Sequence, residues 1–240
     1  MDILGVIPAR GGSKGIPGKN LAMLAGRPLI DYTIDAAKGA ACLSRILVST
    51  DDPTIAEHVL THAGVEVPAL RPDALAQDDT PILPVLLDLL DSLEKQGETL
   101  PDAVCLLQPT SPLRVSADID ACADRLARSA ADTVVTVVPV PHHCNPVSVM
   151  RDGVDGLLSP YLEVAGGTVT RRQDKPAVVA RNGPAVLMVK TSTLRAGSLY
   201  GGRCVGYTMP RERSVDIDEP IDLVVAEALL AWHQREAAQA

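Results

Sequence analysis

The sequence contains no phenylalanine, and its aromatic residues make up only 2% of 240 positions. Hydrophobic residues still account for 46% of the chain, which is enough for a sizeable core. That core must therefore be packed from Leu, Val, Ile and Ala rather than from aromatic rings. A chain of this length forms either one large domain or one domain that carries a small addition.

The sequence also lacks an excess of basic residues, because its formal net charge is -8. Proteins that bind nucleic acids need a basic footprint on their surface, so we expect no nucleic-acid partner. A small anionic ligand is not excluded, since a few local cations are enough to bind one.

The five cysteines are odd in number and show no C-x-x-C spacing. This pattern favours reduced thiols over a disulfide framework or a zinc cluster. No apolar run approaches the length of a membrane span, and no basic leader precedes an apolar segment at the N-terminus. We therefore expect a soluble, cytoplasmic protein with no membrane partner.

Short apolar runs alternate with helical patterns through the first half of the chain. The expected strands cover residues 3–7, 45–50, 65–70, 103–108 and 133–138, and the expected helices cover 29–40, 53–63, 82–95 and 116–128. Continuous apolar strands that alternate with helices predict an α/β fold of the Rossmann-like type. Its sheet should be mainly parallel and covered by helices on both faces.

The alternating pattern stops at Pro139, and residues 140–178 are polar and irregular. Strand-like residues return at 185–189, and a helical pattern covers 219–234. We therefore divide the chain into an α/β domain, formed by 1–139 and 179–240, and an inserted segment at 140–178. An insertion of this size seldom has its own core, so we expect it to pack against a second subunit.

The stretch "IPARGGSKGIPGKN" at residues 7–20 directly follows the first expected strand. Ligands of open α/β sheets bind beyond the carboxyl ends of the strands. The glycines of this loop allow backbone N–H groups to point at an anion, and Arg10, Lys14 and Lys19 add positive charge. The loop does not match the Walker A pattern, but it predicts a phosphate-binding site.

Residues 11–15 also match G-x-S-x-G, which raises the question of whether Ser13 is a nucleophile. In a nucleophile elbow the helix begins immediately after the serine. Here Gly15, Pro17 and Gly18 would break such a helix. We therefore interpret Ser13 as a residue of the phosphate loop, and a hydrolase remains a minor alternative.

A second polar stretch, "QPTSPLR", closes the expected strand that ends near residue 108. Its two prolines favour a rigid, extended turn at the same edge of the sheet. The side chains that this turn would display are those of Gln108, Thr110, Ser111 and Arg114. The alternative is that its hydroxyl residues serve the following helix, with Ser116 as the N-cap.

Near the C-terminus, "SVDIDE" alternates apolar and acidic residues. In an extended chain Asp216 and Asp218 project to the same side. Two carboxylates at this spacing can hold Mg²⁺, which keeps several waters and bridges to substrate phosphates. The alternative for Asp218 is N-capping of the C-terminal helix, with Pro220 in the first turn.

Together these stretches resemble the acylneuraminate cytidylyltransferase family, the CMP-sialic acid synthetases and their relatives for other ulosonic acids. The motifs that carry the resemblance are "IPARGGSKGIPGKNL", "STDD", "RPDALAQDDT", "LLQPTSPLR", "RRQDKPAVVARNG" and "SVDIDEPIDL", which span residues 7–223 in the family's order. The resemblance implies a nucleotide-diphospho-sugar transferase fold of the GT-A-like type. It also implies transfer of CMP from CTP to the hydroxyl of an acidic sugar, with release of pyrophosphate.

The resemblance further implies a set of site residues. The implied nucleotide-binding residues are Ala9, Arg10, Gly11, Gly12, Ser13, Lys14, Lys19, Asn20, Arg71, Asp78 and Thr80. The implied acceptor-binding residues are Gln108, Thr110, Ser111, Arg114, Arg172, Arg181 and Asn182. Asp216 and Asp218 would carry Mg²⁺, or Mn²⁺, and the catalytic residues would be Arg10, Lys19 and Asp218. The 140–178 segment would form a homodimer.

The chain departs from the family on the acceptor side. Many members read N-G-A-I-Y after the arginine, whereas this chain reads "NGPAV" at residues 182–186. One alternative is therefore a cytidylyltransferase that acts on a different acid, such as a phosphonate. A second alternative is a non-catalytic homologue that binds CTP, although the retained Asp216 and Asp218 argue against it.

Overall fold

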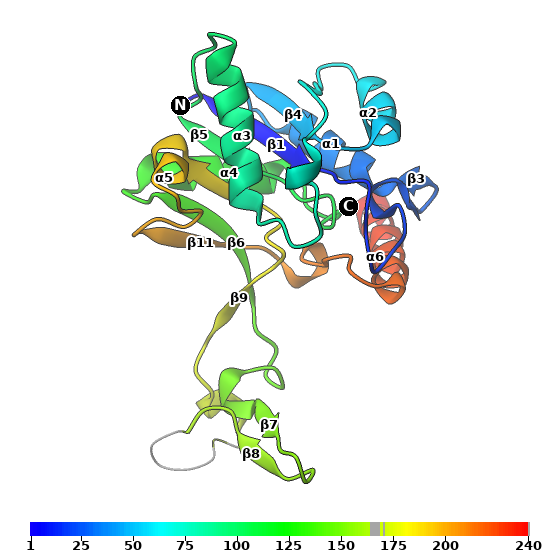
Figure 1. Cartoon of the computed structure of the whole chain (residues 1–240). Coiled ribbons are helices and arrows are strands. Elements are labelled where there is room, and N and C mark those ends of the chain that lie inside the picture. Colours follow the sequence, from blue (N-terminus) through cyan, green and yellow to red (C-terminus); the bar gives the residue numbers. More distant parts are fainter. Residues whose placement is uncertain (164–168, 170, 240) are drawn as a thin grey trace.

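The structure, a computed structural model, describes residues 1–163, 169 and 171–239. In this described part a seven-stranded sheet forms the centre of the molecule, in the order β11-β6-β10-β5-β1-β4, with β9 paired to β6 (Figure 1). Its strands are β1 (Ile3–Pro8), β4 (Arg45–Ser49), β5 (Ala103–Leu106), β6 (Thr133–Pro139), β9 (Val179–Arg181), β10 (Leu187–Lys190) and β11 (Cys204–Thr208).

The sheet is mainly parallel. Strands β4 and β5 both pair in parallel with β1, and β11 pairs in parallel with β6. Only β9 and β10, among the described strands of this sheet, run in the opposite direction. The carboxyl ends of β1, β4 and β5 therefore meet at one edge, which is where ligands of such sheets bind.

Helices cover both faces of the sheet, as the alternation of apolar runs predicted. One face carries α1 (Leu29–Gly39), α2 (Pro53–Leu60) and α4 (Ser116–Arg128), and the other carries α3 (Ile82–Lys95) and α5 (Thr191–Arg195). Successive residues of β1 serve the two faces, because Ile7 packs in the first core and Val6 in the second. The predicted α/β class is thus confirmed.

The last helix, α6 (Pro220–Gln239), packs beside the N-terminal loop rather than on the sheet. A small third core joins Ile16 and Leu24 to Ile217 and Ala226 of the C-terminal region. The remaining short elements are strands β2 (Met23–Leu24) and β3 (Arg27–Pro28) and the 3₁₀ turns Lys19–Leu21, Asp73–Leu75, Pro146–Ser148, Arg172–Asp174 and Arg211–Arg213. None of the helices in the described part of the chain is both long and apolar enough to span a membrane.

The strand predicted at residues 65–70 is wrong. Glu66 forms only an isolated parallel bridge with Leu47. Pro68 follows two positions later, and a proline cannot donate a ladder hydrogen bond. The chain therefore leaves the sheet after a single paired residue.

The two helix caps that the sequence offered as alternatives are not formed. Ser116 is the first residue of α4 rather than its cap, and the Asp118 carboxylate accepts the N–H of Val115 at 3.1 Å. At α6 the Asp222 carboxylate accepts the N–H groups of Asp218 and Glu219. Asp222 therefore accepts the backbone N–H groups that precede α6, so the Asp218 side chain is not needed as the cap.

Between β6 and β9 the described residues 140–163 and 171–178 project from the body as an arm (Figure 1), and the rest of the predicted 140–178 insertion lies largely outside the described residues. The arm carries a two-stranded hairpin, β7 (Met150–Asp152) with β8 (Leu158–Pro160). Its two ends lie side by side, because Val138 pairs with Ala180. Val154 and Leu157 expose apolar side chains on the arm, and the predicted packing against a second subunit stays a prediction.

The second core depends on α3, and Leu90 is fully buried there. Leu90→Ala should lower the free energy of unfolding by about 2–5 kcal/mol, because it removes apolar contacts and leaves a cavity. The matched control is Leu60→Ala, since Leu60 is 60% exposed at the end of α2. Urea denaturation measures both, and equal losses would contradict the assignment of this core.

Candidate active site

A cleft of about 260 Å³ lies beyond the carboxyl ends of β1 and β5. Three separate segments supply its polar lining. The first loop contributes Arg10, Gly12, Ser13, Lys19 and Asn20. The segment between α2 and α3 contributes Arg71, Gln77, Asp78 and Thr80, and the turn after β5 contributes Gln108 and Thr110. Leu75, Ile82 and Val85 form an apolar wall. The structure thus gathers most of the predicted nucleotide-binding residues around one hollow.

The first loop is held at both ends by polar contacts. The Asn20 amide donates to the carbonyl oxygen of Arg10 at 2.8 Å, and the Gly11 N–H donates to Asp51 at 3.0 Å. Gly18 has a φ of +60°, which glycine adopts without strain, and it begins the 3₁₀ turn at Lys19. The route of the loop is therefore fixed without any ligand.

Asp78 neutralises two cations of the loop. Its carboxylate pairs with Arg10 and lies 2.9 Å from the Lys14 ammonium. The Lys14 hydrogen bond, followed by that of Arg10, lowers the pKa of Asp78. Exposed ion pairs of this kind contribute little to stability, so a more highly charged anion can replace the carboxylate.

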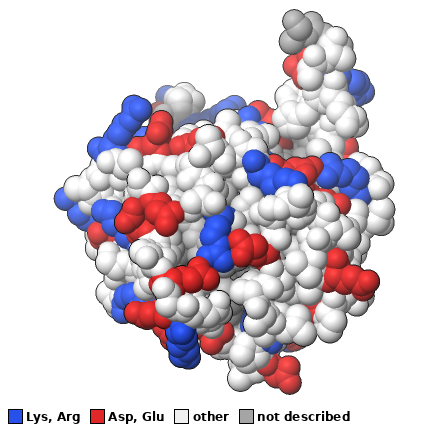
Figure 2. All heavy atoms as spheres, turned by 90° about the horizontal axis from the view of Figure 1, so that it is seen from above, with Lys and Arg blue, Asp and Glu red and all other residues white. Residues whose placement is uncertain are grey.

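Basic side chains are scattered among acidic ones on the face shown in Figure 2 and do not form one broad patch there. This distribution agrees with the net charge of -8. It suits a compact anion better than a long polyanion.

The C-terminal acidic segment is clamped between the first loop and the turn after β5. The Lys19 ammonium donates to the Ile217 carbonyl at 2.7 Å and to the Asp218 carboxylate at 3.1 Å. The Ile217 N–H donates to the carbonyl of Thr110 at 2.7 Å. Gly15 has no room for a side chain, since a Cβ atom there would collide with the Asp218 carbonyl oxygen.

Asp216 carries an unsatisfied carboxylate oxygen beside this clamp. Its Oδ1 atom is buried and has no hydrogen-bond partner among the described residues. Burial raises the pKa of Asp216, and a hydrogen bond from Thr110 acts in the opposite direction. An orphaned carboxylate oxygen close to a second acid provides the hard oxygen ligands that Mg²⁺ prefers. The residues present therefore fit a divalent cation.

Arg114 lies beneath the turn rather than in the cleft lining. Its side chain is buried, and Nη1 donates to the carbonyls of Gln108 at 3.2 Å and Ala185 at 2.8 Å. Burial lowers the pKa of Arg114 to about 10. Ser111 is also buried nearby, and its hydroxyl finds no partner within the described structure. Their contact with an acceptor stays a prediction.

The other predicted acceptor residues lie outside the cleft lining. Asn182 is buried and donates to Ser214 Oγ at 3.0 Å. Arg181 lies over the ring of Tyr200, 4.9 Å from its centroid. Arg172 lies on the arm, in a hollow with Lys175 and Arg211. The structure does not bring these three residues to the phosphate loop.

Two predicted nucleotide residues have structural partners of their own. The N–H of Ala9 donates to the Ser49 carbonyl at 2.9 Å and extends the pairing of β1 with β4. Buried Arg71 donates to that carbonyl at 2.6 Å and to Ser49 Oγ at 3.1 Å. Burial lowers the pKa of Arg71. These residues build the wall next to the loop.

Asp51 and Asp52 were not among the predicted site residues. Asp51 fixes the Gly11 N–H, and Asp52 caps α2 by accepting the N–H of Thr54 at 2.7 Å. A Cβ atom at Gly11 would lie 2.6 Å from the Asp52 carboxylate. The signal was present in the sequence, because two acids precede a proline where a strand gives way to a helix.

The family model described as cytidylyltransferase matches residues 4–151. The chain belongs to the cytidylyltransferase family. A CMP-N,N'-diacetyllegionaminic acid synthase of Legionella pneumophila is 34% identical over 238 residues, which is 98% of both chains. The resemblance inferred from the sequence motifs is therefore confirmed.

Other relatives of this cytidylyltransferase differ in length or only share its fold. An N-acylneuraminate cytidylyltransferase of Streptococcus agalactiae is 33% identical over 221 residues, covering 91% of this chain and 51% of the relative. The solved structure of CMP:2-keto-3-deoxy-manno-octonic acid synthetase complexed with CTP matches with a TM-score of 0.67 and 18% identity. That match covers 97% of this chain and all of the other, and it supports the shared fold.

Gly15→Ala tests the close approach of the loop to Asp218. The added methyl group should force the two segments apart and lower the free energy of unfolding by about 1–3 kcal/mol, as overpacking does. Gly12→Ala is the control, because nothing lies within 4 Å of a Cβ atom at Gly12. Calorimetric melting compares the two variants, and equal destabilisation would refute the clamp.

Proposed function

We propose that this chain is a Mg²⁺-dependent cytidylyltransferase that transfers CMP from CTP to a hydroxyl of an acidic sugar. The acceptor is a sialic acid or a related nonulosonic or ulosonic acid. The observation that carries the proposal is the joining of the glycine-rich cationic loop to the paired acids Asp216 and Asp218 through Lys19. Family membership and the names of the full-length relatives support it.

In the proposed reaction the acceptor oxygen attacks the α-phosphorus of CTP in line. The new oxygen–phosphorus bond forms while the bond to pyrophosphate breaks, and the hydroxyl proton leaves to solvent. Such a transfer depends on positioning and charge neutralisation more than on covalent catalysis. The chain therefore has to hold two anions together and stabilise the leaving group.

The triphosphate takes the place of Asp78 on Arg10 and Lys14. The two cations are already held beside an anion, the Asp78 carboxylate, so they need little reorganisation to receive another. Lys19 remains tied to Asp218 and lines the same cleft. Fixed positive charge at this place offsets the charge that develops on departing pyrophosphate.

Asp216 and Asp218 would hold the Mg²⁺ ion, or Mn²⁺ in its place. The bound ion would polarise the α-phosphate and neutralise part of its charge. One oxygen of the partly buried Asp216 has no partner among the described residues, whereas the Asp218 side chain is 74% exposed and pairs with Lys19. The partly buried Asp216 would fix the position of the ion, and the exposed Asp218 side chain could move to accommodate the substrate.

The arm supplies the proposed homodimer contact. It projects from the body and exposes apolar side chains, which a partner subunit would cover (Figure 1). The five cysteines form no disulfide within the described residues. Free thiols favour a reducing compartment, and we assign the enzyme to the cytoplasm.

A pyrophosphate-release assay tests the reaction directly. The four nucleoside triphosphates are combined with sialic acid, diacetyllegionaminic acid, a ulosonic acid and a phosphonate. We expect release from CTP with one of the carboxylic sugars. Lys19→Ala should abolish it, because that side chain joins the loop to Asp218, and Ser13→Ala should only weaken it.

Three outcomes, the second of which needs a separate CTP-binding measurement, would count against the proposal. Release with the phosphonate alone would move the activity to a different acid. Binding of CTP without release from any acceptor would indicate a non-catalytic homologue. Comparable inactivation by the Lys19 and Ser13 variants would return Ser13 to consideration as a nucleophile.

Asp216→Asn should separate stability from activity. The raised pKa means that folded Asp216 holds its proton more tightly than the unfolded chain does. The free energy of unfolding therefore falls as pH rises through the raised pKa. At neutral pH the destabilisation caused by the ionised, buried carboxylate is fully present. The neutral amide removes that cost and should raise the melting temperature by about 2–4 °C in metal-free buffer.

The same variant should lose turnover and should also lose the added thermal protection that Mg²⁺ with CTP gives the wild type. Calorimetry at pH 7, with and without the ligands, measures both effects. A variant that melts lower than wild type in metal-free buffer would show that Asp216 stabilises the fold instead.

A further inference from the structure

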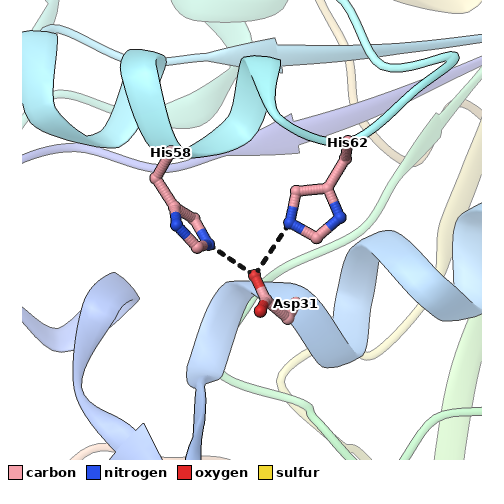
Figure 3. A group of neighbouring side chains, drawn as sticks. All are labelled: Asp31, His58 and His62. Carbon is pink, nitrogen blue, oxygen red and sulfur yellow. Dashed lines mark hydrogen bonds and ion pairs between the residues drawn. The ribbon is translucent and has the colours of Figure 1, made fainter.

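A cluster of metal-ligating side chains lies away from the cleft, between α1 and α2 (Figure 3). Asp31 is in the first turn of α1, His58 is in α2, and His62 follows two residues after the end of α2. The His62 N–H donates to the Val59 carbonyl at 2.9 Å, so the turn after α2 keeps His62 close to the helix end. In Figure 3 both rings face one carboxylate oxygen of Asp31.

The contacts within this cluster are short. The Asp31 Oδ1 atom lies 2.7 Å from His58 Nε2 and 3.2 Å from His62 Nε2. One potential ligand atom from each residue can be chosen so that all three lie within 4.8 Å of one another. The side chains are 11%, 28% and 19% exposed for Asp31, His58 and His62, so the cluster is largely shielded from water.

This geometry is close to that of a metal site. Zinc binds imidazole nitrogen and carboxylate oxygen at about 2.0–2.2 Å, which places the ligands of a tetrahedral site roughly 3.4 Å apart. The two measured separations differ from that value by less than 1 Å. A small side-chain rotation would therefore let the three atoms surround an ion instead of contacting each other.

The donor set selects the class of metal. Two imidazoles and one carboxylate suit Zn²⁺ and its transition-metal neighbours. Mg²⁺ prefers oxygen ligands only, which Asp216 and Asp218 offer and the two imidazoles do not. The cluster is distinct from that cleft, because none of its three residues belongs to the cleft lining.

We propose that Asp31, His58 and His62 bind one Zn²⁺ ion, with water as the fourth ligand. The ion ties the end of α2 to the start of α1. The other end of α2 is capped by Asp52, which follows the Asp51 carboxylate that fixes the phosphate loop at Gly11. The bound ion therefore braces the helix that supports this loop.

Zinc binding to the full-length, chelator-stripped protein tests the site. We expect one equivalent of Zn²⁺ by elemental analysis after gel filtration, and a visible absorption band of low-symmetry coordination when Co²⁺ replaces it. Zinc at about 100 times its dissociation constant should raise the melting temperature by about 5–10 °C. His58→Gln, His62→Gln and Asp31→Asn should each remove the bound equivalent and the thermal shift.

Two controls exclude other ligands in the chain. The double variant His142→Gln, His143→Gln removes the adjacent histidines of the arm, and Asp216→Asn alters the acidic pair. Both should keep the full equivalent of zinc. No zinc bound by wild type, or an unchanged equivalent in the three cluster variants, would overturn the proposal. If a cluster variant fails to fold, the wild-type Co²⁺ spectrum and stoichiometry still decide it.

Discussion

The contact of Lys19 with Ile217 and Asp218 is the interaction on which the site depends. It joins a loop at the beginning of the chain to an acidic segment near its end, and the Thr110 carbonyl holds that segment from the other side. Gly15 allows the approach because it has no side chain to obstruct it. Without this clamp, the cations that suit a triphosphate and the acids that suit a divalent ion would lie on independent loops.

Unsatisfied buried polar atoms lie close to this clamp. Buried polar atoms usually have partners, because each unpaired one costs about 1–3 kcal/mol. Here Asp216 and Arg114 both keep unpaired atoms within the described structure, and both lie around the turn after β5. Such local exceptions concentrate at functional sites, where a ligand completes what the fold leaves open.

The sequence predicted the architecture well because its signals were local. The helix expected at 82–95 is α3, and it has the same two ends. Its apolar periodicity and its flanking residues indicate the same boundaries. The strand expected at 65–70 is absent because Pro68 limits pairing. Ser116 is not the cap because the helix already begins there and Asp118, in its first turn, accepts the N–H of Val115. The motifs named most of the polar residues that line the cleft, but no local pattern could show that Asp78 would neutralise Arg10 or that Arg114 would be buried beneath the turn.

The arm leaves and rejoins the sheet at paired positions, with Val138 opposite Ala180. Because its two ends are already held together, the entropy of closing the excursion changes only slowly with its length. Insertions, deletions or substitutions in the arm would leave the strand pairing of the central sheet unchanged. The arm can therefore evolve separately from the α/β domain. Proteins that share this domain can differ in what their arms contact while the domain itself stays the same.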